Sequence, residues 1–147
     1  MSRGEKFRTI LLMRTLISET VHKIGENVEA EGWIHLRRDH GKLIFLSLRD
    51  RSGFLQIVVN AKVAPGAYES TKELRPEFAV KIVGEVKKRP ENAIDKSSVA
   101  GSVELVAQEI TILSHAEVLP FDMGGKDLSL ELPTLLDHRG LTLRHPK

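Results

Sequence analysis

Apolar and polar residues alternate along much of the chain from Asn27 onward, which is the pattern of half-buried β-strands. The first alternating segment runs from Asn27 to Arg37, and every second residue from Val28 to Leu36 falls on its apolar face. Gly32 lies in the middle of this segment. Because glycine weakens a straight strand, it predicts a bend of the kind that a small barrel needs. The polar residues 39–42 then predict a turn.

Two more alternating segments follow this turn. They comprise residues 43–48 and 54–60, and the polar sequence 49–53 between them ends in glycine and suits a hairpin. The side chains that this pattern directs inward are Ile44, Leu46, Leu48, Leu55, Ile57 and Val59. Phe45 and Gln56 point outward on the two neighbouring strands.

A short helix and two further strands complete the pattern. Residues 67–75 predict a helix that Pro76 stops, and residues 78–88 predict a fourth strand. The polar residues 89–101 predict a loop before a fifth strand at 102–114. The apolar residues of this fifth strand change from odd to even positions partway along it, which predicts a bulge near residues 107–109.

Three strands, a short helix and two more strands form the element order of the OB-fold, an all-β, five-stranded Greek-key barrel. The oligonucleotide face of this fold is built largely from its second and third strands. Phe45 and Gln56 therefore lie where such a barrel binds nucleic acid.

Composition removes several classes of protein. The chain has 147 residues, which is long enough for one domain with a core, and its net charge is +2. It has no cysteine, which excludes disulfides and thiol catalysis. No apolar run approaches the roughly 20 residues that span a bilayer, so we expect a cytoplasmic protein without membrane contact. His35 and His40 have no third ligand at a suitable spacing, so we expect no metal site.

Basic charge is concentrated in one short segment. Between His35 and Arg51 there are five Lys/Arg and two Asp, a surplus of three that exceeds the charge of the whole chain. Trp33, Arg37 and Phe45 all fall at outward positions. Outward aromatic rings beside arginines allow a protein to stack unpaired bases and hold their phosphates, so this segment indicates binding of single-stranded nucleic acid.

Several short motifs at fixed spacing in this segment resemble a known family. They are Arg37-Arg38-Asp39-His40-Gly41, Ile44-Phe45, Leu48-Arg49-Asp50-Arg51 and Gln56-Ile57-Val58. Together they are similar to the N-terminal anticodon-binding domain of aspartyl-tRNA synthetases, the class II group that also contains the asparaginyl and lysyl enzymes. The resemblance extends from about Met13 to Lys147.

The resemblance implies a module that recognises the anticodon loop of aspartate-type tRNA. Phe45 would stack on the central uracil that the aspartate and asparagine anticodons share, Gln56 would hydrogen-bond a base edge, and Arg38 would contact the loop. Because of their charge, we add Arg37 and Lys42 as contacts to backbone phosphates.

The family's catalytic motifs are not found in the sequence, so we expect this chain to contain no catalytic residue and no cofactor. By resemblance, the parent enzyme would be a homodimer whose catalytic domain uses ATP and magnesium to join aspartate to tRNA. We therefore divide the chain into an N-terminal extension (1–13), an OB-fold anticodon-binding domain (14–114) and a linker toward that catalytic domain (115–147).

Other interpretations stay open from the sequence alone. A generic single-strand-binding OB module, or a free-standing relative of the synthetases that binds proteins, would show similar patterns. An outward Phe45 can also be covered by a loop. Arg49 and Arg51 flank Asp50 in a tight turn, which favours a structural role for both. The basic residues 87–89 are typical of a solvated strand end, and contact of this cluster with a tRNA stem stays open.

Overall fold

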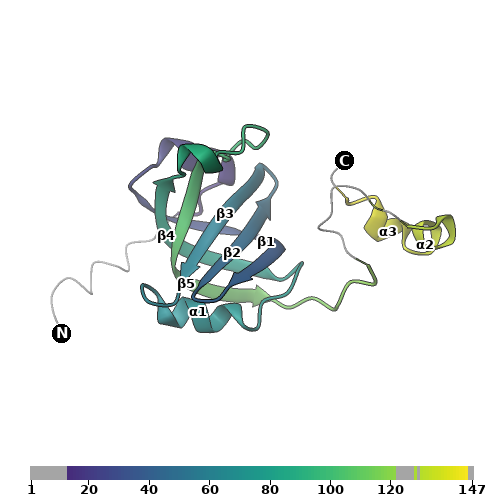
Figure 1. Ribbon diagram of the computed structural model, residues 1–147. Coiled ribbons are helices and arrows are strands. Elements are labelled where there is room, and N and C mark those ends of the chain that lie inside the picture. The colour runs from purple at the N-terminus through teal and green to yellow at the C-terminus, as the bar shows by residue number, and fades with distance from the viewer. Residues whose placement is uncertain (1–12, 122–127, 129, 146–147) are drawn as a thin grey trace. The chain divides into compact units, whose positions relative to one another are not determined.

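Five strands close into a barrel in the computed structural model, which describes residues 13–121, 128 and 130–145 (Figure 1). The elements of this part of the chain are η2 (Ile17–His22), β1 (Asn27–His40), β2 (Leu43–Asp50), β3 (Gly53–Asn60), α1 (Pro65–Thr71), β4 (Ala79–Lys88), η3 (Glu91–Ala93) and β5 (Val103–Ser114). Neighbouring strands follow the order β1-β2-β3-β5-β4, and β4 pairs with β1 to close the barrel. This order, with a helix between the third and fourth strands, confirms the predicted OB-fold.

Strand β1 is shared between two partners and has to bend between them. Residues up to Trp33 pair with β4, and residues from Trp33 onward pair with β2. Gly32 lies at this transition, where a Cβ atom would overlap the carbonyl oxygen of Arg49 on β2. The glycine thus permits a close approach of two backbones, which is the bend that its position in the sequence predicts.

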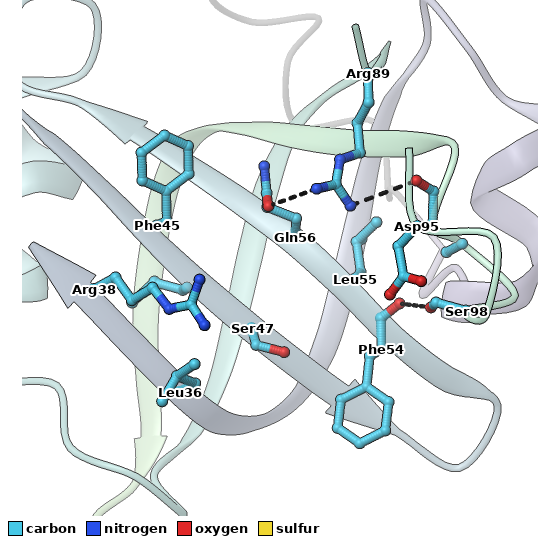
Figure 2. Close-up of a pocket in the computed structure, with 13 residues that line it drawn as sticks. Leu36, Arg38, Phe45, Ser47, Phe54, Leu55, Gln56, Arg89, Asp95 and Ser98 are labelled. Atoms are coloured by element: carbon cyan, nitrogen blue, oxygen red, sulfur yellow. Dashed lines mark hydrogen bonds between the residues drawn. The ribbon is translucent and has the colours of Figure 1, made fainter. Parts of the chain in front are cut away.

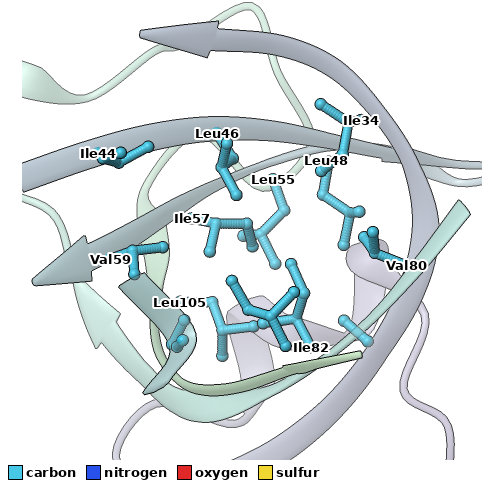
Figure 3. Packing of buried hydrophobic residues seen from close by; sticks show 14 of the residues in the cluster. Ile34, Ile44, Leu46, Leu48, Leu55, Ile57, Val59, Val80, Ile82 and Leu105 are labelled. Carbon is cyan, nitrogen blue, oxygen red and sulfur yellow. The ribbon is translucent and has the colours of Figure 1, made fainter. Parts of the chain in front are cut away.

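The barrel interior is filled by the apolar residues that alternate along the strands (Figure 3). Its largest fully buried side chains are Ile17, Ile34, Ile44, Leu46, Leu48, Leu55, Ile57, Leu74, Ile82, Leu105, Val59 and Val80. Full burial of one such side chain stabilises a fold by about 1.5–3 kcal/mol. Every residue that the sequence directs inward on β2 and β3 belongs to this core, so the side chains between them on the same strands face outward.

Helix α1 lies at one end of the barrel (Figure 1). It begins at Pro65, since proline fits the first turn of a helix, where no N–H partner is needed. It ends at Thr71, earlier than the predicted residue 75. Ala67 and Thr71 are buried beneath the barrel, and the hydroxyl of Tyr68 donates to the carbonyl of Gly41 at 2.8 Å.

Asp50 ties the short helix η2 to the opposite end of the barrel. Its carboxylate accepts hydrogen bonds from the backbone N–H of Ile17 at 2.9 Å and from both the N–H and the hydroxyl of Ser52 at 2.6 Å. Burial raises the pKa of Asp50, but the hydrogen bonds from Ser52, Ile17 and Gly53 together lower the pKa by more than burial raises it. The pKa of Asp50 therefore lies below its ordinary value of 3.8. The sequence did not predict η2, because a single six-residue segment has too few turns to show periodicity.

One bulge in β5 and one in β1 decide which residues share a face, and a further register shift near the end of β5 leaves Leu113 unpaired with β4. In β5, Ala107 faces Gly84 and Glu109 faces Val83, so Gln108 is the extra residue and the predicted bulge is confirmed. In β1, the register shifts between Ile34 and Leu36, which the sequence did not predict. This second bulge reverses the alternation over the last part of β1, including the residues nearest to the predicted binding face.

The end of β1 also differs from the prediction. Residues 39 and 40 continue the strand rather than forming part of a turn, and the turn consists of Gly41 and Lys42. Gly41 has a φ angle of +70°, which favours glycine, and its N–H donates to the carboxylate of Asp39 at 2.9 Å.

The chain divides into two compact units between Ala116 and Glu117. The second unit contains the short helices α2 (Leu132–Asp137) and α3 (Arg139–Thr142), and the rings of Phe121 and His138 lie 5.6 Å apart. Of the predicted N-terminal extension, the structure describes only Met13. Among the residues that it describes, no helix is long and apolar enough to cross a membrane.

Candidate nucleic-acid interface

Two rows of side chains cross the outer face of β1, β2, β3 and β5. Residues that pair across strands lie on the same face of a sheet, so the strand registers define both rows. The first row contains Leu36, Ser47, Gln56 and Glu104, and the second contains Arg38, Phe45, Val58 and Val106. The second row is apolar apart from Arg38 at its end, and the first is mainly polar.

The two rows border a shallow pocket of about 250 Å³ on this face (Figure 2). Arg38, Phe45, Ser47, Phe54 and Gln56 lie along it, and the chain between β4 and β5 forms a further wall. This volume lies just below the roughly 300–1,000 Å³ of pockets that hold small molecules, so it suits a single planar group such as a base. We call this the outer-face pocket below.

Phe45 and Gln56 both point into the outer-face pocket from neighbouring strands, as Figure 2 shows. Both side chains are half-buried, and neither enters the barrel interior. The prediction that they share the outer face is therefore confirmed. The centres of the His40 and Phe45 rings lie 5.3 Å apart with an interplanar angle of 86°, which is an edge-to-face contact.

The amide of Gln56 has a hydrogen-bond partner on each side. Arg89 donates to its carbonyl oxygen at 3.1 Å, and its own NH₂ group donates to the carboxylate of Glu104 at 3.1 Å. An amide has two donor hydrogens and two acceptor positions, so each side retains the capacity for one more hydrogen bond. Such an amide can bind a base edge as donor and acceptor together.

Arg89 lines the pocket but was not assigned to the binding site from the sequence. We interpreted residues 87–89 as a solvated strand end, but the Arg89 guanidinium turns over the sheet to Gln56 and also donates to the carbonyl of Gly101 at 3.4 Å. Two hydrogen bonds hold the chain after Arg89, which forms the pocket wall. The N–H of Asp95 donates to the carbonyl oxygen of Gly101 at 3.0 Å, and the Ser98 hydroxyl donates to the carbonyl oxygen of Phe54 at 3.3 Å. The predicted OB-fold could have indicated this role for the segment, because the loop between strands four and five of that fold often contacts the ligand.

Arg38 and Arg37 lie on different faces of β1. Arg38 pairs with Phe45 and lines the outer-face pocket, whereas Arg37 pairs with Leu46, whose side chain is buried. Our assignment of Arg37 to the outer face, and of Leu36 to the interior, was wrong because the bulge before Leu36 reverses the alternation. Cross-strand pairing thus assigns only one of these two adjacent arginines to the outer-face pocket.

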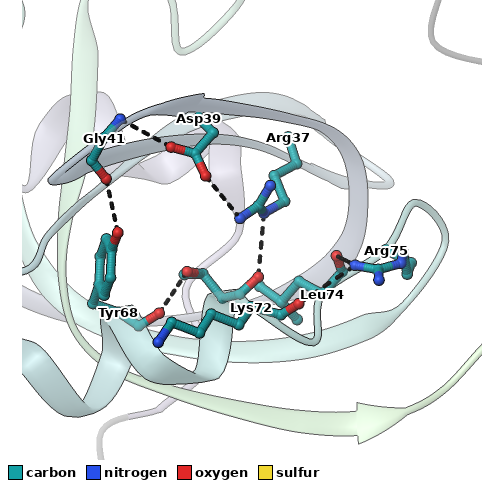
Figure 4. Close-up of polar contacts among 8 residues, drawn as sticks. Arg37, Asp39, Gly41, Tyr68, Lys72, Leu74 and Arg75 are labelled. Atoms are coloured by element: carbon teal, nitrogen blue, oxygen red, sulfur yellow. Dashed lines mark hydrogen bonds and ion pairs between the residues drawn. The ribbon is translucent and has the colours of Figure 1, made fainter.

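The Arg37 guanidinium is used by the barrel itself (Figure 4). Its Nε donates to the carbonyl oxygen of Thr71, the last residue of α1, at 3.2 Å, and its terminal nitrogen lies 3.3 Å from the Asp39 carboxylate. These contacts join β1 to the helix. Lys42, in contrast, is exposed in the β1–β2 turn and is not among the residues that line the pocket.

A separate cluster, outside the lining of the outer-face pocket, consists of Trp33, Arg49 and Glu77. Arg49 forms an ion pair with Glu77 at 2.9 Å, and its guanidinium lies 6.0 Å from the centre of the Trp33 ring. This ion pair agrees with the structural role predicted for Arg49, which lies in β2 rather than in a turn. Trp33 is 45% exposed, which agrees with its predicted outward position. No cluster of three or more potential metal ligands occurs within the ranges that the structure describes.

Comparison with known proteins agrees with this geometry. The model of the tRNA anti-codon family, described as an OB-fold nucleic acid binding domain, matches residues 28–113. Over 121 residues the chain is 40% identical to the aspartate–tRNA(Asp/Asn) ligase of Aquifex aeolicus, an alignment that covers 82% of this chain and 20% of that ligase. The chain spans about a fifth of the length of the curated relatives it matches.

Solved structures give the same relationship. Asparaginyl-tRNA synthetase from Pyrococcus horikoshii matches with a TM-score of 0.66 and 28% identity, covering 85% of this chain and 27% of that one. Aspartyl tRNA synthetase from Entamoeba histolytica matches with a TM-score of 0.78 over 99% of this chain and 35% of that one, and at 20% identity it supports the fold alone. The chain belongs to the family of OB-fold nucleic-acid-binding domains that includes the tRNA anticodon-binding domains, and the resemblance seen in the sequence is confirmed.

Proposed function

We propose that this domain binds the anticodon loop of an aspartate-type tRNA through the outer-face pocket. The observation that carries the proposal is the convergence of Arg38, Phe45 and Gln56 from three neighbouring strands on one open pocket. An anticodon loop presents unpaired bases, whose edges and faces are accessible, unlike those of an A-form helix.

Each of these side chains supplies a different part of the interaction. The Phe45 ring offers a stacking surface, which contributes about 1–3 kcal/mol per base but selects weakly among bases. The Gln56 amide supplies the selective hydrogen bonds to a base edge. Arg38 and Arg89 supply positive charge on opposite sides of the pocket, and Lys42 at the exposed turn would contact a phosphate further along the loop.

Arg37 does not belong to the proposed binding set. Its guanidinium already donates to Thr71 and lies beside Asp39, on the face of β1 that turns away from Phe45. We therefore assign it a role in holding α1 against the barrel.

The activity of the longer protein is also part of the proposal. The relatives of this chain are aspartate–tRNA ligases, so we propose that the parent protein joins aspartate to tRNA in a separate catalytic domain with ATP and magnesium. This domain would position the tRNA for that reaction. A homodimeric parent enzyme in the cytoplasm is the arrangement that we expect from the family resemblance.

Binding to anticodon stem-loops tests the proposed function. The probes are an aspartate-type stem-loop, versions with one anticodon base replaced, and an unstructured oligonucleotide of equal length and charge. We expect the unaltered stem-loop to bind best and the Gln56→Ala variant to lose base preference more than affinity. The matched control is Leu113→Ala, which changes an exposed apolar side chain on β5 outside the pocket.

The results separate the proposal from a generic single-strand-binding module. Such a module would bind the unstructured oligonucleotide as tightly as the stem-loop and would show no preference at any anticodon position. A uniform loss across all stem-loops in Gln56→Ala would contradict the proposed role of this residue in reading a base.

A further inference from the structure

We propose that Glu77 is a positioning residue that holds the bulge of β1 and so keeps Arg38 at the outer-face pocket. The inference rests on the proposed function, and its positioning part can be tested without RNA. Glu77 lies in the segment between α1 and β4 and is not among the residues that line the pocket. The sequence did not predict it for the site.

The backbone of Glu77 continues the pairing of β1 up to its bulge. Strand β4 begins at Ala79, which pairs with Trp33, so the backbone groups of Ile34 lie beyond the end of that strand. The Glu77 N–H donates to the carbonyl oxygen of Ile34 at 2.7 Å, and the Ile34 N–H donates to the carbonyl oxygen of Phe78 at 2.9 Å. Ile34 is the last residue before the register shift. The segment before β4 therefore fixes the residue at which the bulge starts.

The side chain of Glu77 reaches the same bulge by a second route. Its carboxylate accepts a hydrogen bond from Arg49 at 2.9 Å, and both side chains are half-buried. The other terminal nitrogen of Arg49 lies 3.3 Å from Nδ1 of His35. His35 is the extra residue of the bulge, because the register with β2 shifts between Ile34 and Leu36. Hydrogen bonds between charged groups are stronger than neutral ones, so this route supports the bulge beyond the backbone contacts.

The backbone conformation of Glu77 shows that its surroundings hold it in place. Its φ angle is +71°, and within the described ranges it is the only residue other than glycine with a positive φ. Side chains disfavour this region, which glycine adopts readily. Such a conformation persists only where other contacts hold it, and those with Ile34 and Arg49 do so here. A glycine would remove the strain, but it would also remove the carboxylate that reaches Arg49.

The bulge decides which arginine faces the ligand, so its support affects binding. A shift of one residue in strand register turns the following side chains to the opposite face. If the bulge relaxed, Arg38 would turn away from the outer-face pocket, and Arg37 would lose its contact with Thr71. Glu77 therefore acts on RNA binding through Arg38, and the contact of Arg37 reports the state of the bulge.

The RNA-free test follows the Nε–H signal of Arg37 in NMR spectra of the whole chain. This group donates to Thr71 rather than to Glu77, so its exchange with solvent reports the bulge. We expect exchange to be about three- to tenfold faster in Glu77→Ala, because the bulge loses its charged support. Glu77→Gln, which keeps an acceptor oxygen, should restore most of the protection. Unchanged exchange in Glu77→Ala would overturn the proposal.

Two further variants separate the carboxylate from the backbone and from charge in general. Glu77→Gly removes both the strain and the carboxylate, so it should resist urea better than Glu77→Ala while Arg37 loses the same protection. Full protection of Arg37 in Glu77→Gly would show that the carboxylate is not needed and would overturn the proposal. The matched control is Glu73→Ala, which removes the same charge from the same segment, where the exposed carboxylate contacts His115. It should leave the exchange of Arg37 unchanged, and equal acceleration would show a general effect of charge.

The RNA test asks whether Glu77 acts through Arg38. Alone, Glu77→Ala should weaken binding of the aspartate-type stem-loop about three- to tenfold and reduce the slope of log K against log salt by up to about one. In a chain that already carries Arg38→Ala, the same change should weaken binding by less than about twofold, because the group that Glu77 positions is gone. Equal losses in both chains would overturn the proposal.

The two tests fail separately from the proposed function. If the unaltered chain binds the stem-loop no better than the unstructured oligonucleotide, the proposed function fails, and with it the effect of Glu77 on RNA binding. The exchange of the Arg37 Nε–H then decides alone whether Glu77 holds the bulge.

Discussion

The outer-face pocket and the helix-facing end of the barrel share strand β1 but use its basic residues in opposite ways. The helix-facing end consists of Arg37, Asp39, Gly41, Tyr68 and Thr71, whose polar groups are hydrogen-bonded to one another (Figure 4). In the outer-face pocket, the charged and aromatic side chains converge on an open hollow. At the helix-facing end, Arg37 of β1 contacts Thr71 of α1 and so supports the fold. In the outer-face pocket, Arg38 of the same strand stays exposed at the surface.

A single extra residue produces this difference. The bulge between Ile34 and Leu36 turns Arg38 toward Phe45 and Arg37 toward α1. Bulges commonly redirect side chains beside functional sites, and this one determines which arginine can reach a ligand. Residue type alone therefore does not identify the binding arginine, because two identical neighbours have different roles.

Loss of the Asp50 carboxylate should produce the largest change, and it should leave the outer-face pocket intact. Asp50→Asn weakens the charge-assisted hydrogen bonds to η2, so we expect the free energy of unfolding to fall by about 1.5–3 kcal/mol at neutral pH. Because the folded-state pKa lies below 3.8, the carboxylate stabilises the fold above that pH and loses this effect as the pH falls through the lowered pKa.

Urea denaturation at pH 7 and at pH 3 measures both effects of Asp50. The difference between the unaltered chain and Asp50→Asn should shrink at the lower pH, while RNA affinity at pH 7 changes little. A constant difference at both pH values would contradict the role of the ionised carboxylate.

Truncation of Phe45 should affect the outer-face pocket alone. Phe45→Ala removes the stacking surface, so we expect binding of the anticodon stem-loop to weaken by about 1–3 kcal/mol. Calorimetric titration measures the loss, and the thermal unfolding curve reports whether the barrel is intact. Unchanged binding by a folded variant would remove Phe45 from the interface.

The adjacent arginines give the sharpest contrast between the two regions. Arg38→Ala should weaken RNA binding and reduce the slope of log K against log salt by about one, with little change in stability. Arg37→Ala should lower the free energy of unfolding by about 1 kcal/mol through its lost bond to Thr71, with the salt slope unchanged. If both variants lose binding and salt dependence equally, the division of β1 into two faces has no functional meaning.

Lys42 should have the smallest effect. It lies outside the pocket at an exposed turn, so Lys42→Ala should reduce the salt slope by at most about one and leave base preference unchanged. Filter binding across a salt series measures this slope. Altered preference among the stem-loops would place Lys42 at a base rather than at a phosphate.

The sequence predicted the barrel well because its core residues alternate along most of each strand. Even the β5 bulge was readable, since the apolar residues change from odd positions at Val103 and Leu105 to even positions at Ile110 and Ile112. The β1 bulge left no such trace. Leu36 continues the apparent alternation, and Arg37 and Arg38 are both charged, so neither position shows which face it occupies.

The polar contacts of the candidate site were also beyond sequence reasoning. Phe45 and Gln56 were found from alternation and from the family motifs. Arg89 and Glu104 reach Gln56 from segments 33 and 48 residues away in the chain, and only the barrel closure brings them together. Contacts of this kind depend on strand register, which the hydrophobic pattern of one strand does not fix for its distant partner.

Titration of a labelled domain with an aspartate-type anticodon stem-loop tests the central claim most directly. If the outer-face pocket binds the loop, the NMR signals of Arg38, Phe45 and Gln56 should shift strongly and saturably, while those of Arg37 and Tyr68 at the helix-facing end stay unchanged. Shifts concentrated at the helix-facing end, with the pocket signals unmoved, would contradict the account.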